Sequence, residues 1–155
     1  MNKAFVKDED GAPLGEALPD REIAPHPNFV TAEGLAQIDA MLAEADTAFA
    51  TAQEADDRDA MARAAREQRY WTSRRSTAQL VEKPKDHGQV RFGARVTLER
   101  DDKRKQTFRI VGLDEADPEK GTLSYISPLA QALLGKKVGD VVNAGGHESK
   151  IVAIS

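Results

Sequence analysis

The spacing of apolar residues between positions 35 and 52 constrains the fold of this chain most. Apolar side chains recur there at alternating intervals of three and four residues, at Leu35, Ile38, Leu42, Ala45, Phe49 and Ala52. A stripe this narrow is typical of a helix that packs along one partner helix, because a helix lying on a globular core has a wider apolar face. Thr31 is a suitable N-cap for this helix, and Glu33 lies in its first turn, where the helix dipole favours an acid.

A second helix is predicted from about Ala60 to Val81, directly after an acidic stretch. Its stripe is weaker and contains two polar residues: Met61, Ala64, Gln68, Trp71, Arg75 and Ala78. Arg75 can occupy such a position only if its stem lies along the partner helix and its guanidinium points outward.

The short connection between the two helices predicts that they run antiparallel. We therefore expect a helical hairpin over residues 29–83 with the acidic stretch at its tip. We also expect arginines of the second helix to pair with acids of the first, among them Glu44, Asp46 and Glu54.

The regions on either side of the hairpin differ in character. Residues 1–28 hold four of the seven prolines and no long apolar periodicity, which predicts a flexible acidic tail. From Pro84 onward apolar residues alternate with polar ones, with turn residues at 101–104 and 145–146 and a helix start at Ser127–Pro128. Residues 84–155 are therefore predicted to form an α+β domain, an antiparallel sheet with one short helix. Its expected core includes Phe92, Val96, Phe108, Ile110, Leu133 and Leu134.

Several kinds of chemistry find no support in the composition. The 155 residues include no cysteine, which excludes disulfides, thiolate metal sites and a cysteine nucleophile. The three histidines are far apart in the chain, and no glycine-rich phosphate loop or serine-hydrolase elbow is present. With 22 basic against 26 acidic residues and no long apolar run, we expect no duplex binding by charge alone and no membrane span. We expect a monomeric cytoplasmic protein that is not an enzyme and has no metal or cofactor of its own.

Three blocks of the C-terminal region resemble one family. They are residues 90–96 (VRFGARV), 108–117 (FRIVGLDEAD) and 126–140 (ISPLAQALLGKKVGD). In this order and spacing they resemble the C-terminal domain of the bacterial Gre transcript-cleavage factors, with a closer likeness to the GreB-like branch. Residues 28–35 and 74–81 resemble the two ends of the Gre coiled-coil arm. The resemblance implies an FKBP-like fold for residues 84–155.

The resemblance also implies a partner and a mode of action. Gre factors dock on the rim of the secondary channel of bacterial RNA polymerase and insert the arm toward the active centre. Acids at the arm tip help to hold a catalytic Mg²⁺ there, so the polymerase hydrolyses its own backtracked RNA. The factor would then touch RNA or DNA only within the transcription complex. The matching docking residues are Asp114, Glu115, Asp117, Ile126, Ser127, Pro128 and Leu129.

The predicted tip departs from the family pattern. The family has Gly-Asp-x-Ser-Glu-Asn there, whereas this chain has Asp56, Asp57 and Asp59 without the Ser, Glu or Asn. Both helices are also predicted to be roughly two turns shorter than usual, which removes on the order of 10 Å of reach. The tip acids are therefore candidates for shared Mg²⁺ binding or, alternatively, simple turn and N-cap residues.

Three functions remain open at this stage. The first is a cleavage-stimulating elongation factor. The second is a regulator that occupies the channel without cleavage, and so competes with cleavage factors or modulates initiation. The third is a prolyl isomerase, which would need an aromatic-lined pocket in residues 84–155.

Overall fold

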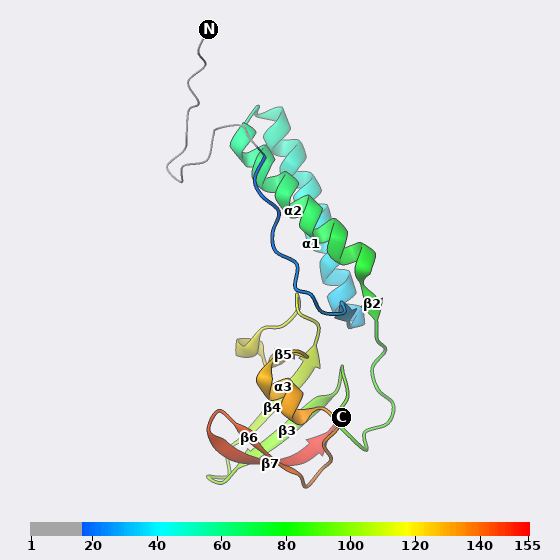
Figure 1. Ribbon diagram of the computed structural model, residues 1–155, viewed down its shortest axis with the longest axis vertical. Helices are drawn as coiled ribbons and strands as arrows, with labels where there is room; N and C mark the ends of the chain where they lie inside the picture. Colours follow the sequence, from blue (N-terminus) through cyan, green and yellow to red (C-terminus); the bar gives the residue numbers. More distant parts are fainter. Residues whose placement is uncertain (1–16) are drawn as a thin grey trace. The chain divides into compact units, whose positions relative to one another are not determined.

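The computed structural model of the protein describes residues 17–155 (Figure 1). The chain divides into two compact units. The hairpin unit comprises residues 38–77 together with the segment that ends at His26, and the sheet unit comprises residues 27–37 and 78–155. The first turns of the first long helix therefore belong to the sheet unit.

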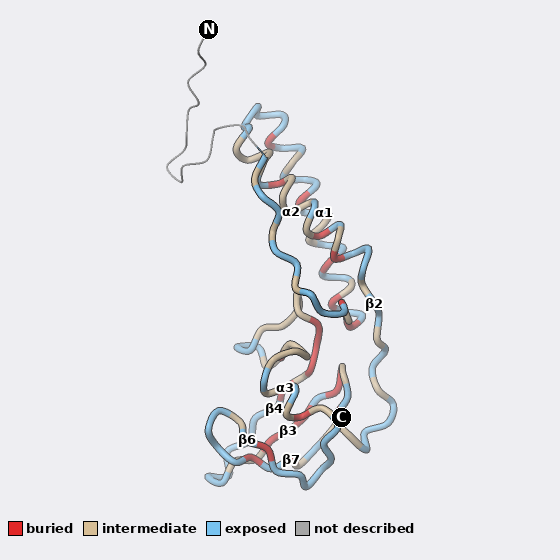
Figure 2. The backbone as a smooth tube through the Cα atoms, in the orientation of Figure 1, coloured by how far each residue is buried: buried red, intermediate tan, exposed pale blue. Residues whose placement is uncertain are grey.

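Two helices form the hairpin: α1 (Ala32–Glu54) and α2 (Arg58–Thr77). All six residues of the predicted α1 stripe are buried or half-buried, which confirms the stripe as the packing face. Figure 2 shows the buried positions along the sides on which the two helices face each other.

The polar positions of the α2 stripe are satisfied by hydrogen bonds and ion pairs to α1. Arg75 Nε lies 2.6 Å from Asp39 Oδ1, and Gln68 Nε2 donates to Asp46 Oδ1 at 2.8 Å. Arg75 is exposed, as its predicted outward orientation requires.

The helix α2 ends four residues earlier than predicted, at Thr77 rather than Val81. The reason is tertiary, because the chain after it pairs with the segment that leads into α1. Strands β1 (Phe29–Val30) and β2 (Gln79–Leu80) run parallel, with Phe29 opposite Gln79. This small pair ties the two ends of the hairpin together within the sheet unit.

The main sheet has the strand order β5-β4-β3-β7-β6. Its elements are β3 (Arg95–Arg100), β4 (Lys105–Val111), η1 (Pro118–Lys120), β5 (Thr122–Ser124), α3 (Pro128–Leu133), β6 (Val141–Ala144) and β7 (His147–Ile154). The predicted antiparallel sheet with one short α-helix is confirmed, except that the edge strand β5 pairs parallel with β4. Both predicted turns, at residues 101–104 and 145–146, connect antiparallel neighbours.

The core of the sheet unit lies between the sheet and α3. It contains Val90, Val96, Leu98, Phe108, Ile110, Leu123, Ala130, Leu133, Val142 and Ile151. Of the predicted core residues, Phe92 and Leu134 are only partly buried and pack against this cluster. The residues before Arg95 form no strand, although Val90 is buried and bonded through its backbone to Gly135 and Lys136.

The segment of residues 17–26, which we call the strap, lies within the predicted tail. The predicted flexible tail covered residues 1–28. Its first part, residues 1–16, lies outside the described residues. The strap, in contrast, runs extended alongside the hairpin helices (Figure 1) and contacts α2 through Asp20 and Arg21.

Candidate functional site

The hairpin tip is a tight connection built almost entirely from capping interactions. Asp56 has a left-handed backbone conformation, with φ of 50°. Its N–H bonds to Gln53 O at 3.1 Å, and the N–H of Asp57 bonds to Ala52 O at 2.9 Å. These two bonds form a Schellman motif, in which glycine is the usual residue at the left-handed position.

The tip acids have separate local roles. The carboxylate of Asp57 accepts from the N–H of Ala60 at 3.1 Å and so caps α2, while Asp59 lies in the first turn of α2. Within residues 17–155 no group of three or more His, Asp or Glu side chains is arranged to hold a metal ion. The three acids alone therefore do not form a metal site, and a role with Mg²⁺ would need ligands from a partner.

Glu115 holds the root of the hairpin, by which we mean the residues around Thr31 where α1 begins. One carboxylate oxygen accepts from the hydroxyl of Thr31 at 2.5 Å, and the other accepts from the N–H groups of Thr31 at 3.1 Å and Gly112 at 3.3 Å. Thr31 is 2% exposed, and its hydroxyl caps α1 by accepting from the N–H of Gly34 at 3.0 Å. The predicted N-cap is confirmed, and Glu115 extends it into a network with the loop after β4.

Two glycines make room for this network. A Cβ on Gly34 would lie 2.0 Å from Oε2 of Glu115, and a Cβ on Gly112 would lie 2.4 Å from the carbonyl oxygen of Phe29. Contacts this short cannot exist between real side chains and their neighbours, so larger residues would displace Glu115 or the β1 backbone.

A second contact at the root joins α1 to β4. Glu33 lies 3.4 Å from the guanidinium of Arg109. Hydrogen bonding by its own backbone N–H, and then by Arg109, lowers the pKa of Glu33 below its ordinary value. This contact favours the ionised acid in the first turn of α1, as the helix dipole does.

Aromatic side chains pack together beside the root. Phe29, Phe92 and Tyr125 form edge-to-face pairs with ring centroids 5.5 to 6.1 Å apart, and the Tyr125 hydroxyl donates to Pro27 O. The prolyl-isomerase alternative needs an aromatic-lined pocket within residues 84–155. Of the rings there, Phe92 and Tyr125 pack against each other and against Phe29.

The predicted docking residues lie in the loop after β4 and at the start of α3, both in the sheet unit. Asp117 caps η1 by accepting from the N–H of Glu119, and Ser127 caps α3 by accepting from the N–H of Ala130. Pro128 is exposed, whereas Asp114, Ile126 and Leu129 are half-buried. Glu115, Asp117 and Ser127 therefore have structural partners of their own, and Pro128 is the most open of the predicted set.

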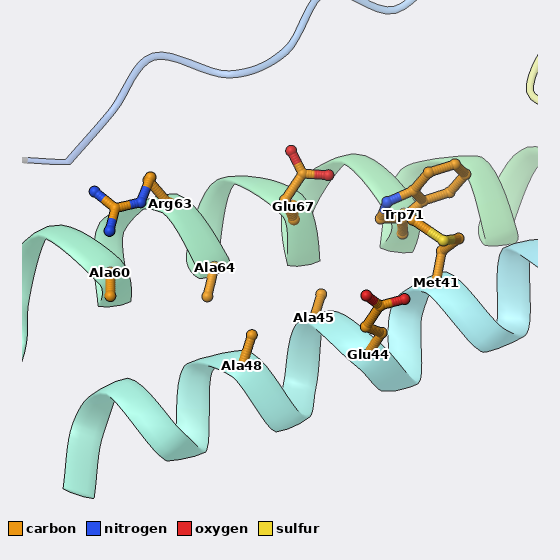
Figure 3. A pocket seen from close by; sticks show the side chains of 9 residues that line it. All are labelled: Met41, Glu44, Ala45, Ala48, Ala60, Arg63, Ala64, Glu67 and Trp71. Atoms are coloured by element: carbon orange, nitrogen blue, oxygen red, sulfur yellow. The ribbon is translucent and has the colours of Figure 1, made fainter. Parts of the chain in front are cut away.

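A groove of about 400 Å³ lies between the two hairpin helices (Figure 3). Ala45 and Ala48 of α1 point toward Ala60 and Ala64 of α2, and these small side chains leave the space open. Trp71 closes one end, and its buried indole N–H has no acceptor among residues 17–155.

Sequence reasoning missed three features of these sites. It proposed Glu115 for partner docking and did not predict that the Glu115 carboxylate holds the hairpin root. It placed Arg74 on a solvated face of the second helix, whereas Arg74 is 3% exposed. It expected the arginines of α2 to pair with α1, whereas Arg69 pairs with Asp20 of the strap. Gly34 in the first turn of a helix was a usable signal, because glycine is unfavourable there unless a neighbour needs the space.

Comparison with known proteins gives a consistent result. The family model "Transcription elongation factor, GreA/GreB, C-term" matches residues 84–155. Transcription elongation factor GreA of Maricaulis maris is 40% identical over 106 residues, which cover 59% of this chain and 68% of that protein. GreA of Paracoccus denitrificans is 44% identical over 84 residues, covering 51% of this chain and 54% of that protein.

GreB of Pasteurella multocida matches at 44% identity, which lies within the 40% to 50% range of the GreA proteins, so the two branches are not distinguished. The chain spans about half the length of most curated relatives that it matches. Among solved structures, GreA factor homolog 1 of Thermus thermophilus is similar with a TM-score of 0.39 and 22% identity. That similarity covers 84% of this chain and 99% of the other.

Proposed function

Because the chain belongs to the GreA/GreB family of transcription elongation factors, we propose that it binds bacterial RNA polymerase at the secondary channel and regulates elongation. In this proposal the sheet unit docks at the channel rim and the hairpin enters the channel. The protein itself is not an enzyme, because any RNA cleavage takes place at the active centre of the polymerase. It acts in the cytoplasm, and nucleic acid is near it only within the transcription complex.

One observation supports the proposal most directly. Glu115, in the region that matches the family (residues 84–155), bonds to Thr31 at the root of a helical hairpin. The neighbouring β1–β2 pair ties the two ends of the hairpin together in the same unit. A docking domain and the start of a long hairpin are therefore one folded unit. This combination suits a factor whose sheet unit binds the surface of a large enzyme while its hairpin enters a channel of that enzyme.

Cleavage stimulation is the first form of this function. It would require Asp56, Asp57 or Asp59 to complete a Mg²⁺ site together with carboxylates of the polymerase, where the metal would orient a water and neutralise phosphate charge. Carboxylates are the right ligand type for Mg²⁺, and at the hairpin tip Asp56 and Asp57 are exposed while Asp59 is half-buried.

A regulator without cleavage activity is the second form, and the tip geometry favours it. Asp57 already caps α2, and Asp56 serves as the helix-ending residue of α1. Such a protein would compete with cleavage factors for the channel or modulate initiation by occupying it.

One experiment tests both forms. Immobilised core polymerase is incubated with the protein, and a backtracked complex is then assayed for RNA cleavage in the same tube. Asp57→Asn and Asp59→Asn remove charge from the tip, and an asparagine at position 57 retains an N-cap acceptor, so loss of cleavage would report chemistry rather than misfolding. If the polymerase retains the protein and RNA is cleaved, and the two variants abolish this cleavage, the cleavage-stimulating form is supported. If the polymerase retains the protein but no RNA is cleaved, the regulator without cleavage activity is supported. Failure of the polymerase to retain the protein would refute the proposed function.

A further inference from the structure

The strap, residues 17–26, contacts α2 through side chains of consecutive residues. Arg21 Nη1 lies 2.7 Å from Glu67 Oε2, and Asp20 Oδ1 lies 2.5 Å from Arg69 Nε. The carbonyl oxygen of Leu18 also accepts from Arg69 Nη2 at 2.9 Å. Because neighbouring strap residues of opposite charge meet α2 residues of opposite charge, only one register of the strap satisfies both pairs.

Aromatic rings of α2 add a further contact for Arg21. Its guanidinium carbon lies 3.7 Å from the ring centroid of Tyr70 and 5.7 Å from that of Trp71. Both distances are within the range of cation–π attraction. Arg21 is therefore the residue that anchors the strap.

The strap is nevertheless held weakly. None of residues 17–26 is buried, and the apolar side chain of Ile23 is 44% exposed. The side chains of the Arg21–Glu67 pair are 37% and 36% exposed, and those of the Arg69–Asp20 pair are 43% and 73% exposed. Ion pairs with this much solvent contact add little stability and are screened by salt.

Two prolines explain how so few contacts can order the segment. Pro19 and Pro25 restrict the backbone of the free strap to extended conformations, so docking costs less conformational entropy. A segment that is easily ordered and weakly bound can exchange readily between docked and free states.

We propose that the strap is a releasable cover over the α2 side chains Glu67, Arg69 and Tyr70, and that binding of the hairpin to RNA polymerase displaces it. This inference rests on the proposed function. While docked, the strap neutralises Arg69 and Glu67 and adds a third chain segment beside the two helices. Displacement would expose these side chains for contact with the polymerase. It would also reduce the width of the hairpin from three chain segments to two helices.

The first test needs only the isolated protein. Trp71 is the single tryptophan of the chain, so its fluorescence reports on Arg21 without interference from other tryptophans. Raising the NaCl concentration from about 0.05 to about 1 M should release the strap and change the Trp71 emission. Arg21→Ala should already show the emission of the released state at low salt. Glu22→Ala is the matched control, because Glu22 is an exposed charged neighbour, and it should behave as the unmodified chain.

The second test follows the strap in the complex. Since the chain has no cysteine, Glu22→Cys and Gln53→Cys give a unique pair of spin labels on the strap and α1. The free protein should give one narrow distance distribution, and core polymerase should broaden it or shift it to longer distances. Arg21→Ala should also tighten polymerase binding up to roughly tenfold, because binding no longer has to displace the docked strap.

These readouts separate failure of this inference from failure of the proposed function. Salt-dependent release is measured without polymerase, so it stands even if the protein does not bind the enzyme. A strap that keeps its narrow distance distribution in the polymerase complex would overturn the inference and leave the proposed function intact. An Arg21→Ala variant that binds polymerase more weakly would also overturn it, because the strap would then contribute to the interface.

Discussion

Replacing Gly34 by alanine tests how Glu115 holds the root of the hairpin. In the folded protein a Cβ at position 34 would lie 2.0 Å from Oε2 and 2.5 Å from Cδ of Glu115. The atoms that it meets belong to a side chain that makes three hydrogen bonds, two to Thr31 and one to Gly112. The carboxylate must therefore move and weaken these bonds.

The expected magnitude follows from two opposing effects. Hydrogen bonds to a charged group contribute about 1.5 to 3 kcal/mol each, and a shifted carboxylate keeps part of them through water. Alanine in place of glycine stabilises a helix by about 0.5 to 1 kcal/mol. We expect Gly34→Ala to lower the free energy of unfolding of the sheet unit by about 2 kcal/mol.

A double-mutant cycle isolates the clash. In an Glu115→Ala background the obstructing carboxylate is absent, so Gly34→Ala should stabilise the protein by about 0.5 to 1 kcal/mol. The coupling between the two positions should therefore be about 2.5 to 3 kcal/mol. Hydrogen exchange of the Ile110 amide, which lies in the core of the sheet unit and bonds to Ala94 O, reports the opening free energy. Equal destabilisation by Gly34→Ala in both backgrounds would refute this account of the root.

Three further predictions concern the helix ends. Asp57→Ala should destabilise the hairpin by about 1 kcal/mol through loss of the cap on Ala60, whereas Asp57→Asn should be nearly neutral; thermal unfolding followed by circular dichroism compares the two. Asp56→Gly should raise the melting temperature, because glycine adopts the left-handed conformation without strain, and an unchanged or lower value would contradict the Schellman assignment. The lowered pKa of Glu33 means that its stabilising effect is complete above the ordinary glutamate pKa of about 4.3 and is lost as the pH falls through the lowered value. An NMR titration should show that Arg109→Met raises the pKa of Glu33 only part of the way to its ordinary value, because the hydrogen bond from the Glu33 backbone N–H remains.

The sequence was sufficient for the elements whose signals are local. The alternating spacing from Leu35 to Ala52 predicted the packing face of α1, and Thr31 and Ser127 predicted two helix starts. Local patterns succeed here because helix periodicity and capping depend on residues within one or two turns of each other.

The end of α2 and the parallel pairing of β5 could not be read from such patterns. Residues 78–81 continue the helical spacing, but pairing of Gln79 and Leu80 with β1 outweighs it. The path of the chain through η1 determines that β5 runs parallel to β4. The alternation of apolar residues is the same for a parallel and an antiparallel strand, so it does not predict this direction.

For the candidate sites, the chain by itself determined the acidic tip, the loop residues and the likeness of residues 84–155 to a known family. Tertiary structure alone decided what several of those residues do. Glu115 holds Thr31 across 84 positions of sequence, and Arg21 meets Glu67 across 46. A carboxylate or a guanidinium has the same composition whether it faces solvent or a partner within the chain, so only the folded arrangement shows which of them are already engaged.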